Sequence, residues 1–311
     1  MPVPCILDCD PGHDDAIAIL LAAAHPEIEL RAITTVGGNG ALDKVTLNAR
    51  RVCTLAGVLD VPIAAGAAGP PGGALEVAAD VHGESALDGA ELPEPAMALD
   101  PRPAGELIAQ ELAAASEPVT IVAIGPLTNI AAVLERVEQT AIREIVWMGG
   151  STERGNSTPY AEFNAYTDPE AVAAVLHSGV PFTMIGLNLT HQALATPEVV
   201  ARMRALDTPL GDAVAGWLTF FGATYEALFG FAAPPVHDPC AIALLAEPGV
   251  VRCVDAFLAV ETEGRWTRGA TVVDLDGRLG RPPNARVAVE LDAARFWELV
   301  VAAVERLVRR A

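Results

Sequence analysis

The chain has 311 residues, of which 51% are hydrophobic and 19% charged, and its 20 basic and 40 acidic residues give a net charge of −20. This composition is typical of a well-packed globular enzyme and excludes a disordered or fibrous chain. A surface this acidic repels nucleic acid and anionic membranes, and we expect neither as a partner. A small neutral ligand is compatible with this charge.

The first two-thirds of the chain alternates short apolar runs with helical patterns. Continuous apolar strands separated by helices of this length predict βαβ units and a mostly parallel sheet. We therefore expect an α/β, Rossmann-like fold, with a central sheet flanked by helices and the carboxyl ends of its strands on one edge. The predicted strands are 3–7, 28–36, 61–64, 119–124, 142–148 and 182–187, and the predicted helices are 14–24, 42–56, one from about 129, and 168–177.

Two stretches interrupt this alternation, and the pattern changes after residue 196. Segment 66–101 is rich in Gly, Ala and Pro and too long for a routine connection, which indicates a functional loop or lid. Segment 149–167 is a polar loop. A helical insertion, small strands and a final helix follow, and without a linker or internal repeat we expect one domain, 1–311. The insertion is predicted at 197–206 and 210–228, the strands at 256–261, 270–273 and 287–291, and the last helix from 293 to about 308.

Export and disulfide signals are both missing from the sequence. The N-terminal segment MPVPCILDCD has no basic region and reaches an aspartate at Asp8, unlike a signal peptide. No apolar run is long enough to span a bilayer. The five cysteines include no CxxC pair, so we expect reduced, mostly buried thiols. Together these features predict a cytoplasmic protein.

Four carboxylates crowd the end of the first predicted strand, in the stretch DCDPGHDD. Asp8 and Asp10 are two residues apart and so point to the same side of a strand. Asp14 and Asp15 open the next helix, whose dipole favours negative charge. Asp14 alone could be a helix cap, but four acids exceed what capping needs. Converging carboxylates raise one another's pKa or bind a cation, and an all-oxygen donor set indicates Ca²⁺ or Mg²⁺.

Further polar motifs follow other strands at the same predicted edge. Asn39 closes the turn after the second strand, segment 125–129 (GPLTN) follows the fourth, and segment 148–150 (MGG) ends the fifth. The pair His237-Asp238 brings an imidazole and another acid from the far end of the chain. Ligands of open parallel sheets bind beyond the carboxyl ends of the strands. Each motif is a weak signal alone, but together they predict one rim around a site.

In combination these motifs resemble the nucleoside hydrolases, and within them the inosine-uridine preferring N-ribohydrolase branch. The resemblance covers nearly the whole chain, in order and without large gaps. It implies cleavage of the N-glycosidic bond of purine or pyrimidine ribonucleosides to free base and ribose, in nucleoside salvage or catabolism. It also implies a homotetramer or, as the alternative, a homodimer. The matching stretches are DCDPGHDDA (8–16), ITTVGGN (33–39), HGE (82–84), EFN (162–164) and VHDPC (236–240).

The resemblance also implies a Ca²⁺ site and a general base. The ion would be held by Asp10, Asp15, the backbone carbonyl of Ile124 and Asp238. Asp10 would take a proton from a water whose acidity the metal raises. The residues implied to bind or line the ribose are Asp14, Asn39, Met148, Asn156, Glu162 and Asn164.

Cleavage of the C1′–N bond develops oxocarbenium character on the ribose and negative charge on the base. His237 is the predicted general acid, because imidazole titrates near working pH. His82 and Tyr225 are candidate base contacts, although His82 could be a mobile lid residue and Tyr225 a core or surface aromatic. Phe229 stands where some relatives carry a polar or basic residue, which leaves the preferred base open. His13 receives no role.

Two other functions are compatible with parts of the sequence. A haloacid dehalogenase-type phosphatase also places a DxD pair after its first strand and binds Mg²⁺, but it lacks the second acidic pair and gives the HDPC motif no role. A catalytically inactive nucleoside-binding relative would be favoured if a metal ligand or His237 were missing, and all of them are present.

Overall fold

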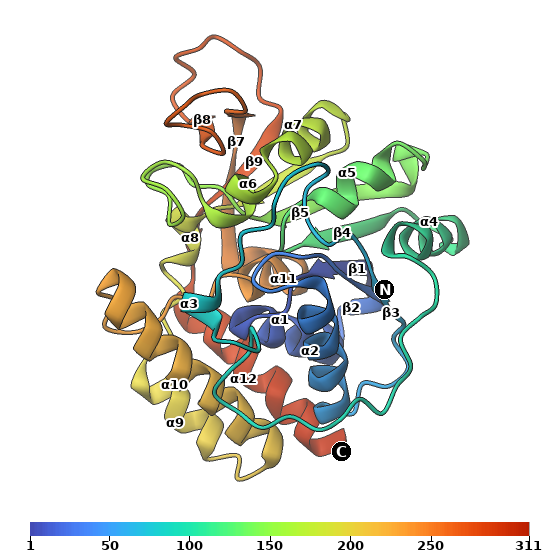
Figure 1. Ribbon diagram of the computed structural model, residues 1–311, viewed down its shortest axis with the longest axis vertical. Helices are drawn as coiled ribbons and strands as arrows, with labels where there is room; N and C mark the ends of the chain where they lie inside the picture. Colours follow the sequence, from blue (N-terminus) through green and yellow to red (C-terminus); the bar gives the residue numbers. More distant parts are fainter. Residues whose placement is uncertain (311) are drawn as a thin grey trace.

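The computed structural model describes residues 1–310, and its centre is a nine-stranded sheet in the order β3-β2-β1-β4-β5-β6-β9-β7-β8 (Figure 1). Neighbours from β3 to β6 pair in parallel, and β9 adds in parallel to β6. Only β7 and β8, at one edge, are antiparallel. The predicted α/β fold with a mostly parallel sheet is confirmed. The strands are β1 (Val3–Cys9), β2 (Ile28–Thr35), β3 (Ile63–Ala65), β4 (Val119–Ala123), β5 (Ile142–Met148), β6 (Phe182–Ile185), β7 (Val251–Val260), β8 (Thr271–Asp274) and β9 (Ala285–Leu291).

Helices cover both faces of the sheet, so the strands carry apolar residues on both sides. In β1, Leu7 packs into a core shared with α1, α2, α11 and α12, while Ile6 packs into the opposite core with α4, α5 and α7 (Figure 1). The helices are α1 (His13–Ala24), α2 (Leu42–Leu55), α3 (Ala79–His82), α4 (Ala104–Ala114), α5 (Thr128–Leu134), α6 (Phe163–Thr167), α7 (Pro169–His177), α8 (Leu187–Thr190), α9 (Pro197–Arg204), α10 (Pro209–Phe229), α11 (Pro239–Ala246) and α12 (Ala293–Arg310), with short 3₁₀ turns at Gln139–Ala141 and Pro248–Val250.

The strand order reverses between β1 and β4, which are adjacent in the sheet but far apart in sequence. From β1 the chain moves outward through β2 to β3, and it then returns to β4 and moves outward on the other side. Asp8 and Ala123 are partners in the parallel pair β1–β4. The loops that follow these two strands diverge, and such a switch point is where open α/β sheets bind ligands.

The late helical insertion is confirmed as α9 and α10, and each begins with a proline at its first helical position. Five helices were missed by the pattern analysis: the short helices α3, α6 and α8, and the longer helices α4 and α11. Helix α4 follows the Gly- and Pro-rich segment directly and was not separated from it. Helix α11 (PCAIALLA) is buried at all eight positions, so it shows no polar face from which a helical period could be recognised. Strand β7 also begins five residues earlier than predicted, at Val251.

Segment 66–101 is mostly irregular, but it is held down at several points. The backbone N–H of Ala78 donates to the carbonyl of Asn39 over 3.1 Å, and the Asn48 side chain donates to the carbonyls of Pro11 and Ser85. Its one short helix, α3, ends at His82, which is buried. The segment is therefore an ordered loop. It begins beside the end of β2, where the Gly66 N–H donates to the Thr35 carbonyl.

Two expectations from composition can be compared with the structure. All five cysteines are free, and four of them are buried while Cys253 is partly exposed. Within residues 1–310, no helix combines the length and the apolar character needed to cross a bilayer.

Candidate active site

A cavity of about 360 Å³ opens beyond the carboxyl ends of β1 and β4. Every site residue predicted from the sequence lines it, except Asp10 and Asp15, which are fully buried. The structure therefore brings together side chains that are more than 200 positions apart in the chain. The predicted residues that line the cavity are Asp14, Asn39, His82, Ile124, Met148, Asn156, Glu162, Asn164, Tyr225, His237 and Asp238.

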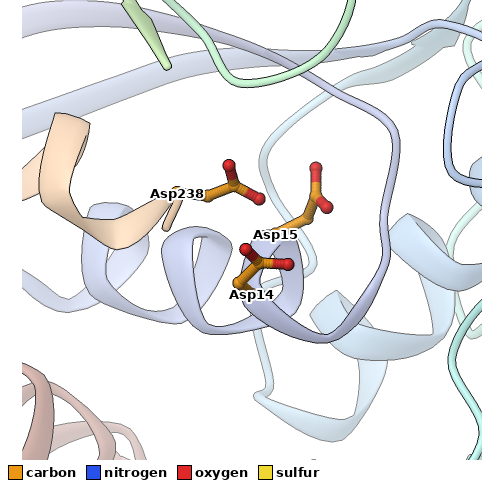
Figure 2. Close-up of side chains that lie close together, drawn as sticks. All are labelled: Asp14, Asp15 and Asp238. Atoms are coloured by element: carbon orange, nitrogen blue, oxygen red, sulfur yellow. The ribbon is translucent and has the colours of Figure 1, made fainter. Parts of the chain in front are cut away.

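An acidic cluster forms the floor of the site. Asp14 and Asp15 lie in the first turn of α1, and Asp238 occupies the N-cap position of α11. Their carboxylates lie close together, and one oxygen from each lies within 4.8 Å of the other two (Figure 2). The sequence analysis assigned Asp15 and Asp238 to the ion and Asp14 to the sugar, whereas the geometry groups all three.

Asp10 lies beside this cluster and is tied to it through the backbone. Its own N–H donates to Asp15 Oδ1 over 3.0 Å, and its Oδ2 accepts the Asn39 backbone N–H over 2.7 Å. The other oxygen, Oδ1, is buried and has no hydrogen-bond partner among residues 1–310. A buried unpaired polar atom costs about 1–3 kcal/mol. Asp10 Oδ1 is therefore available to pair with a bound cation.

The charges of the cluster also favour the binding of a cation. Burial, reinforced by the neighbouring carboxylates, raises the pKa of Asp10 and of Asp238 far above the usual range. Burial likewise raises the pKa of Asp15, and it raises that of Asp14 to about 7. Within the described chain, no Lys or Arg lines the cavity to neutralise these groups. An all-oxygen, electron-rich donor set of this kind fits Ca²⁺ or Mg²⁺.

The amide of Asn164 connects two neighbouring strand ends. Its Nδ2 donates to the carbonyl of Ile124 over 3.0 Å and to that of Met148 over 3.1 Å. Because a carbonyl oxygen has two lone pairs, the Ile124 oxygen keeps one for a further partner. Asn164 therefore fixes the orientation of the carbonyl that was predicted as a metal ligand.

Glu162 and Asn156 shape the opposite wall. The Glu162 carboxylate caps α6 and accepts the backbone N–H groups of Gly150, Asn164 and Ala165. Burial nevertheless raises its pKa to about 7. Asn156 Oδ1 accepts the Phe163 N–H over 2.9 Å. These polar groups give one wall of the cavity several hydrogen-bonding atoms in a fixed arrangement.

His237 is part of a hydrogen-bonded chain of three side chains. Its Nδ1 lies 2.7 Å from the Thr190 hydroxyl and its Nε2 lies 2.7 Å from the Tyr225 hydroxyl. Burial lowers the pKa of His237 to about 3. Burial therefore favours the neutral ring, whereas the sequence analysis expected an acid that titrates near working pH. Thr190 was missed, although its place in LNLTH, a polar residue after an apolar strand, was a usable signal.

The aromatic side of the cavity is formed by α10 and by the end of α3. Phe221 packs edge-on against Tyr225, with ring centroids 4.6 Å apart, and stacks on His82 at 5.5 Å. Phe229, flagged as a specificity position, lines the same cavity and is 41% exposed. Phe221 was not predicted, since an aromatic residue on a long apolar helix gives no sign of which face it occupies.

A Rossmann-like sheet, a floor of buried carboxylates that suits a cation and a wall of amides and carboxylates are typical of an enzyme that binds polar small molecules. Comparison with known proteins narrows this class. The sequence profile of the family described as inosine-uridine preferring nucleoside hydrolase matches residues 5–298. The chain belongs to this family.

Relatives and solved structures agree with the assignment. A protein of Salmonella typhimurium named pyrimidine-specific ribonucleoside hydrolase RihA is 46% identical over 96% of this chain and 97% of its own length. The protein of the same name from Photobacterium profundum is 45% identical over 96% and 98%. The structure of a purine-preferring ribonucleoside hydrolase from Gardnerella vaginalis superposes with a TM-score of 0.92, at 31% identity, over 99% of this chain and 100% of that one.

The enzyme class follows from these matches. The chain is a ribonucleoside hydrolase that cleaves an N-glycosyl bond, as the sequence analysis expected. The alternative of a haloacid dehalogenase-type phosphatase is wrong.

Proposed function

We propose that the protein is a calcium-dependent hydrolase with a preference for pyrimidine ribonucleosides, which it converts to free base and ribose. The observation that carries the proposal is the group of four buried carboxylates at the switch point, with Asp10 Oδ1 unpaired beside the cavity. The base preference is supported by the names of the relatives at 45–46% identity, which are pyrimidine-specific. The solved purine-preferring enzyme is more distant, at 31%.

Four protein ligands suit the ion. We assign them to Asp10, Asp15 and Asp238 through their carboxylates and to Ile124 through its carbonyl. When bound, Ca²⁺ supplies Lewis acidity that lowers the pKa of a water molecule, together with coordination of ribose hydroxyls. Asp10 accepts the proton of the attacking water at Oδ1, the oxygen that has no hydrogen-bond partner among the described residues.

The remaining polar residues orient the sugar. Asp14, in the acidic floor, and Asn39, which contacts Asp10 and Asp15, form one row, and Asn156, Glu162 and Asn164 form a second. All five line the cavity. A ribose held between two such rows presents C1′ to the water and develops its positive charge among carboxylates, which stabilise it. Met148 supplies an apolar contact in the same place.

The departing base needs a proton, and the hydrogen-bonded chain of Thr190, His237 and Tyr225 provides one. Burial raises the pKa of Tyr225 far above its usual range, so its hydroxyl keeps its proton. As the C1′–N bond breaks, Tyr225 donates that proton to the base nitrogen and becomes a tyrosinate. A His237 ring that carries its proton on Nε2 donates a hydrogen bond to the tyrosinate oxygen, and water that enters after product release returns the proton. The predicted His237 acid thus acts through Tyr225 in this proposal.

The cellular setting is proposed on the same basis. Nucleoside cleavage serves salvage or catabolism, and we propose that it takes place in the cytoplasm in a single-domain enzyme. Positions 10 to 238 of one chain supply every residue assigned above. A homotetramer, or otherwise a homodimer, is expected from the family resemblance, and analytical ultracentrifugation of the purified protein measures it.

A nucleoside panel tests the proposed function. Uridine, cytidine, inosine, adenosine and guanosine are incubated with the enzyme, and free base is quantified by chromatography with Ca²⁺ and after exhaustive chelation. We expect uridine and cytidine to have the highest kcat/KM and chelation to abolish turnover. Faster release of hypoxanthine or adenine would contradict the base preference, and unchanged activity in chelator would contradict the metal requirement.

Metal affinity should depend on pH in a defined direction. Bound metal requires deprotonated ligands, and burial raises the pKa values of Asp10, Asp15 and Asp238 in the metal-free protein. Protons therefore compete with Ca²⁺ as the pH falls, and calorimetry between about pH 8 and pH 5.5 should show weaker binding at the acid end. At 100 times the dissociation constant, Ca²⁺ should stabilise the fold by about 2.7 kcal/mol. Affinity that does not change with pH would argue against carboxylate ligation.

Close backbone approach around Asp10 gives a second prediction. A Cβ at Gly125 would lie 2.5 Å from Asp10 Oδ1 and 3.0 Å from Val36 Cγ1. Gly125→Ala should therefore displace the carboxylate and reduce kcat with uridine by about tenfold or more. In the matched control Gly105→Ala, the new Cβ meets only Val133 Cγ2 at 3.6 Å, inside helix α4. That control should keep full activity and gain about 0.5–1 kcal/mol of stability.

A further inference from the structure

One end of the sheet carries a small lobe that the catalytic proposal does not use. It consists of β7, β8 and the segment between them, 261–270, and it lies beside α6 and α7 at the top of Figure 1. None of its residues lines the cavity. Its contacts nevertheless reach the polar loop 149–167, which carries the wall residues Asn156, Glu162 and Asn164.

The hydroxyl of Thr271, the first residue of β8, holds the backbone of Ser151 in this loop. Its Oγ1 accepts the Ser151 N–H over 2.8 Å and donates to the Ser151 carbonyl over 2.6 Å. One hydroxyl thus pairs both polar backbone atoms of a residue 120 positions away. Because Ser151 is only 4% exposed, neither atom can turn to water unless the loop shifts.

Gly150 allows Thr271 to approach this closely. Its φ of +70° is a left-handed conformation that favours glycine, and a Cβ there would lie 2.7 Å from Thr271 Cγ2. The Gly150 N–H in turn donates to Glu162 Oε2 over 2.8 Å. Thr271 is therefore linked to Glu162, which lines the cavity, through the backbone of Gly150 and Ser151.

The lobe also packs against the other end of the same loop. Gly269 has a φ of +81°, and a Cβ there would lie 2.7 Å from Tyr166 Cα and 3.2 Å from Ala161 Cβ. Three consecutive residues, 269–271, therefore contact both the start and the end of loop 149–167. The loop that forms the wall is held from outside the cavity by this one segment.

We propose that segment 269–271 positions the wall of the active site and that Thr271 is its positioning residue, which fixes Gly150 and, through it, the Glu162 carboxylate for contact with the ribose. That contact rests on the proposed function, whereas the hydrogen bonds of Thr271 do not. Without the hydroxyl, the Ser151 N–H and carbonyl lose their partner in a buried place, which is unfavourable. The loop then shifts toward water, and Glu162 loses the geometry that binding needs.

Two substitutions at Thr271 separate positioning from packing. Thr271→Val replaces the hydroxyl by a methyl of similar size, whereas Thr271→Ser keeps the hydroxyl and removes the methyl beside Gly150. We expect Thr271→Val to raise KM about tenfold, the usual effect of one lost hydrogen bond. The turnover number kcat should change much less, because the wall contacts the ribose in the ground state as well as in the transition state. The substrate is uridine, or whichever nucleoside of the panel is cleaved fastest.

The conservative variant decides between the two roles. Thr271→Ser should have a KM close to that of the wild-type enzyme, because both hydrogen bonds to Ser151 can still form. If Thr271 only fills space, the order reverses, with Thr271→Val normal and Thr271→Ser impaired. That reversed order would overturn the proposal, and so would a wild-type KM in Thr271→Val.

Val272→Ala is the matched control for disturbance of β8. Val272 is the next residue of the same edge strand, so its side chain points to the opposite face from that of Thr271, and it is 47% exposed. The control should leave KM unchanged. A KM increase as large as that of Thr271→Val would show that any change in β8 impairs the site, and the specific role of Thr271 would be refuted.

Hydrogen exchange tests the positioning without turnover. The amides of Gly150 and Ser151 are followed by mass spectrometry in the purified enzyme without substrate. We expect both to exchange about tenfold faster in Thr271→Val than in the wild-type enzyme or Thr271→Ser. Unchanged exchange at Gly150 would overturn the proposal, since the hydrogen bond to Glu162 would then not depend on Thr271. This result is obtained even if no nucleoside is cleaved, in which case only the proposed function fails.

Discussion

Replacing Asp10 by asparagine is expected to lower kcat for uridine by about 10³-fold or more, since loss of a general base alone costs about 10²–10⁴ and a metal ligand is weakened as well. The substitution keeps the size of the side chain, and an amide oxygen can still accept the Asn39 N–H. What disappears is the negative charge and the ability to take a proton at the position of Oδ1. Base release and Ca²⁺ affinity, measured on the same preparation, separate these two losses.

The neighbouring acid Asp8 provides the matched control. Like Asp10 it is fully buried, does not line the cavity and has one oxygen, Oδ2, without a hydrogen-bond partner among residues 1–310. It differs in that its Oδ1 accepts the Thr34 hydroxyl and the Asn129 amide, which hold it against β2 and α5. Burial raises its pKa to about 7. Asp8→Asn should therefore keep most of the activity while Asp10→Asn loses it. Comparable loss in both variants would indicate that the effect is electrostatic disruption of the fold around β1 and not loss of the base.

The two aspartates also show what sequence reasoning can and cannot separate. The strand, the Pro-Gly turn and the helix in DCDPGHDD are local, so their pattern was enough to place all four acids at one edge. Which acid faces the cavity depends on partners from β2 and α5, and these contacts are tertiary. Asp8, for example, is held by the Thr34 hydroxyl from β2 and the Asn129 amide from α5.

The difference between local patterns and tertiary contacts also explains which elements and residues the sequence analysis missed. The alternation of apolar runs and helices was sufficient for the parallel sheet, because that pattern is set by burial on both faces. Helix α11 was missed for the opposite reason, since complete burial removes the polar face that marks a helix. The pKa of His237 depends on desolvation by residues from α8 and α10, so a value for isolated imidazole could not anticipate it. Phe221 enters the site only through folding, since its helix is apolar on several faces.

Tyr225 carries the second large expected effect. In Tyr225→Phe the ring and its packing against Phe221 and Phe229 remain, but the hydroxyl that lies 2.7 Å from His237 Nε2 is lost. If this hydroxyl protonates the base, kcat for uridine should fall by about 10²-fold or more. KM should change far less than kcat, because the aromatic ring that lines the cavity is kept and the lost hydroxyl acts only as the bond breaks.

The nature of the leaving group makes this prediction specific. A nitrophenolate departs without a proton, so Tyr225→Phe should cleave 4-nitrophenyl riboside as fast as the wild-type enzyme does. Tyr160→Phe is the control, since Tyr160 is 56% exposed and does not line the cavity; it should behave as wild type with both substrates. An equal loss of rate on both substrates in Tyr225→Phe would mean that the hydroxyl positions the ribose, and the proton donor to the base would then have to be His237 itself.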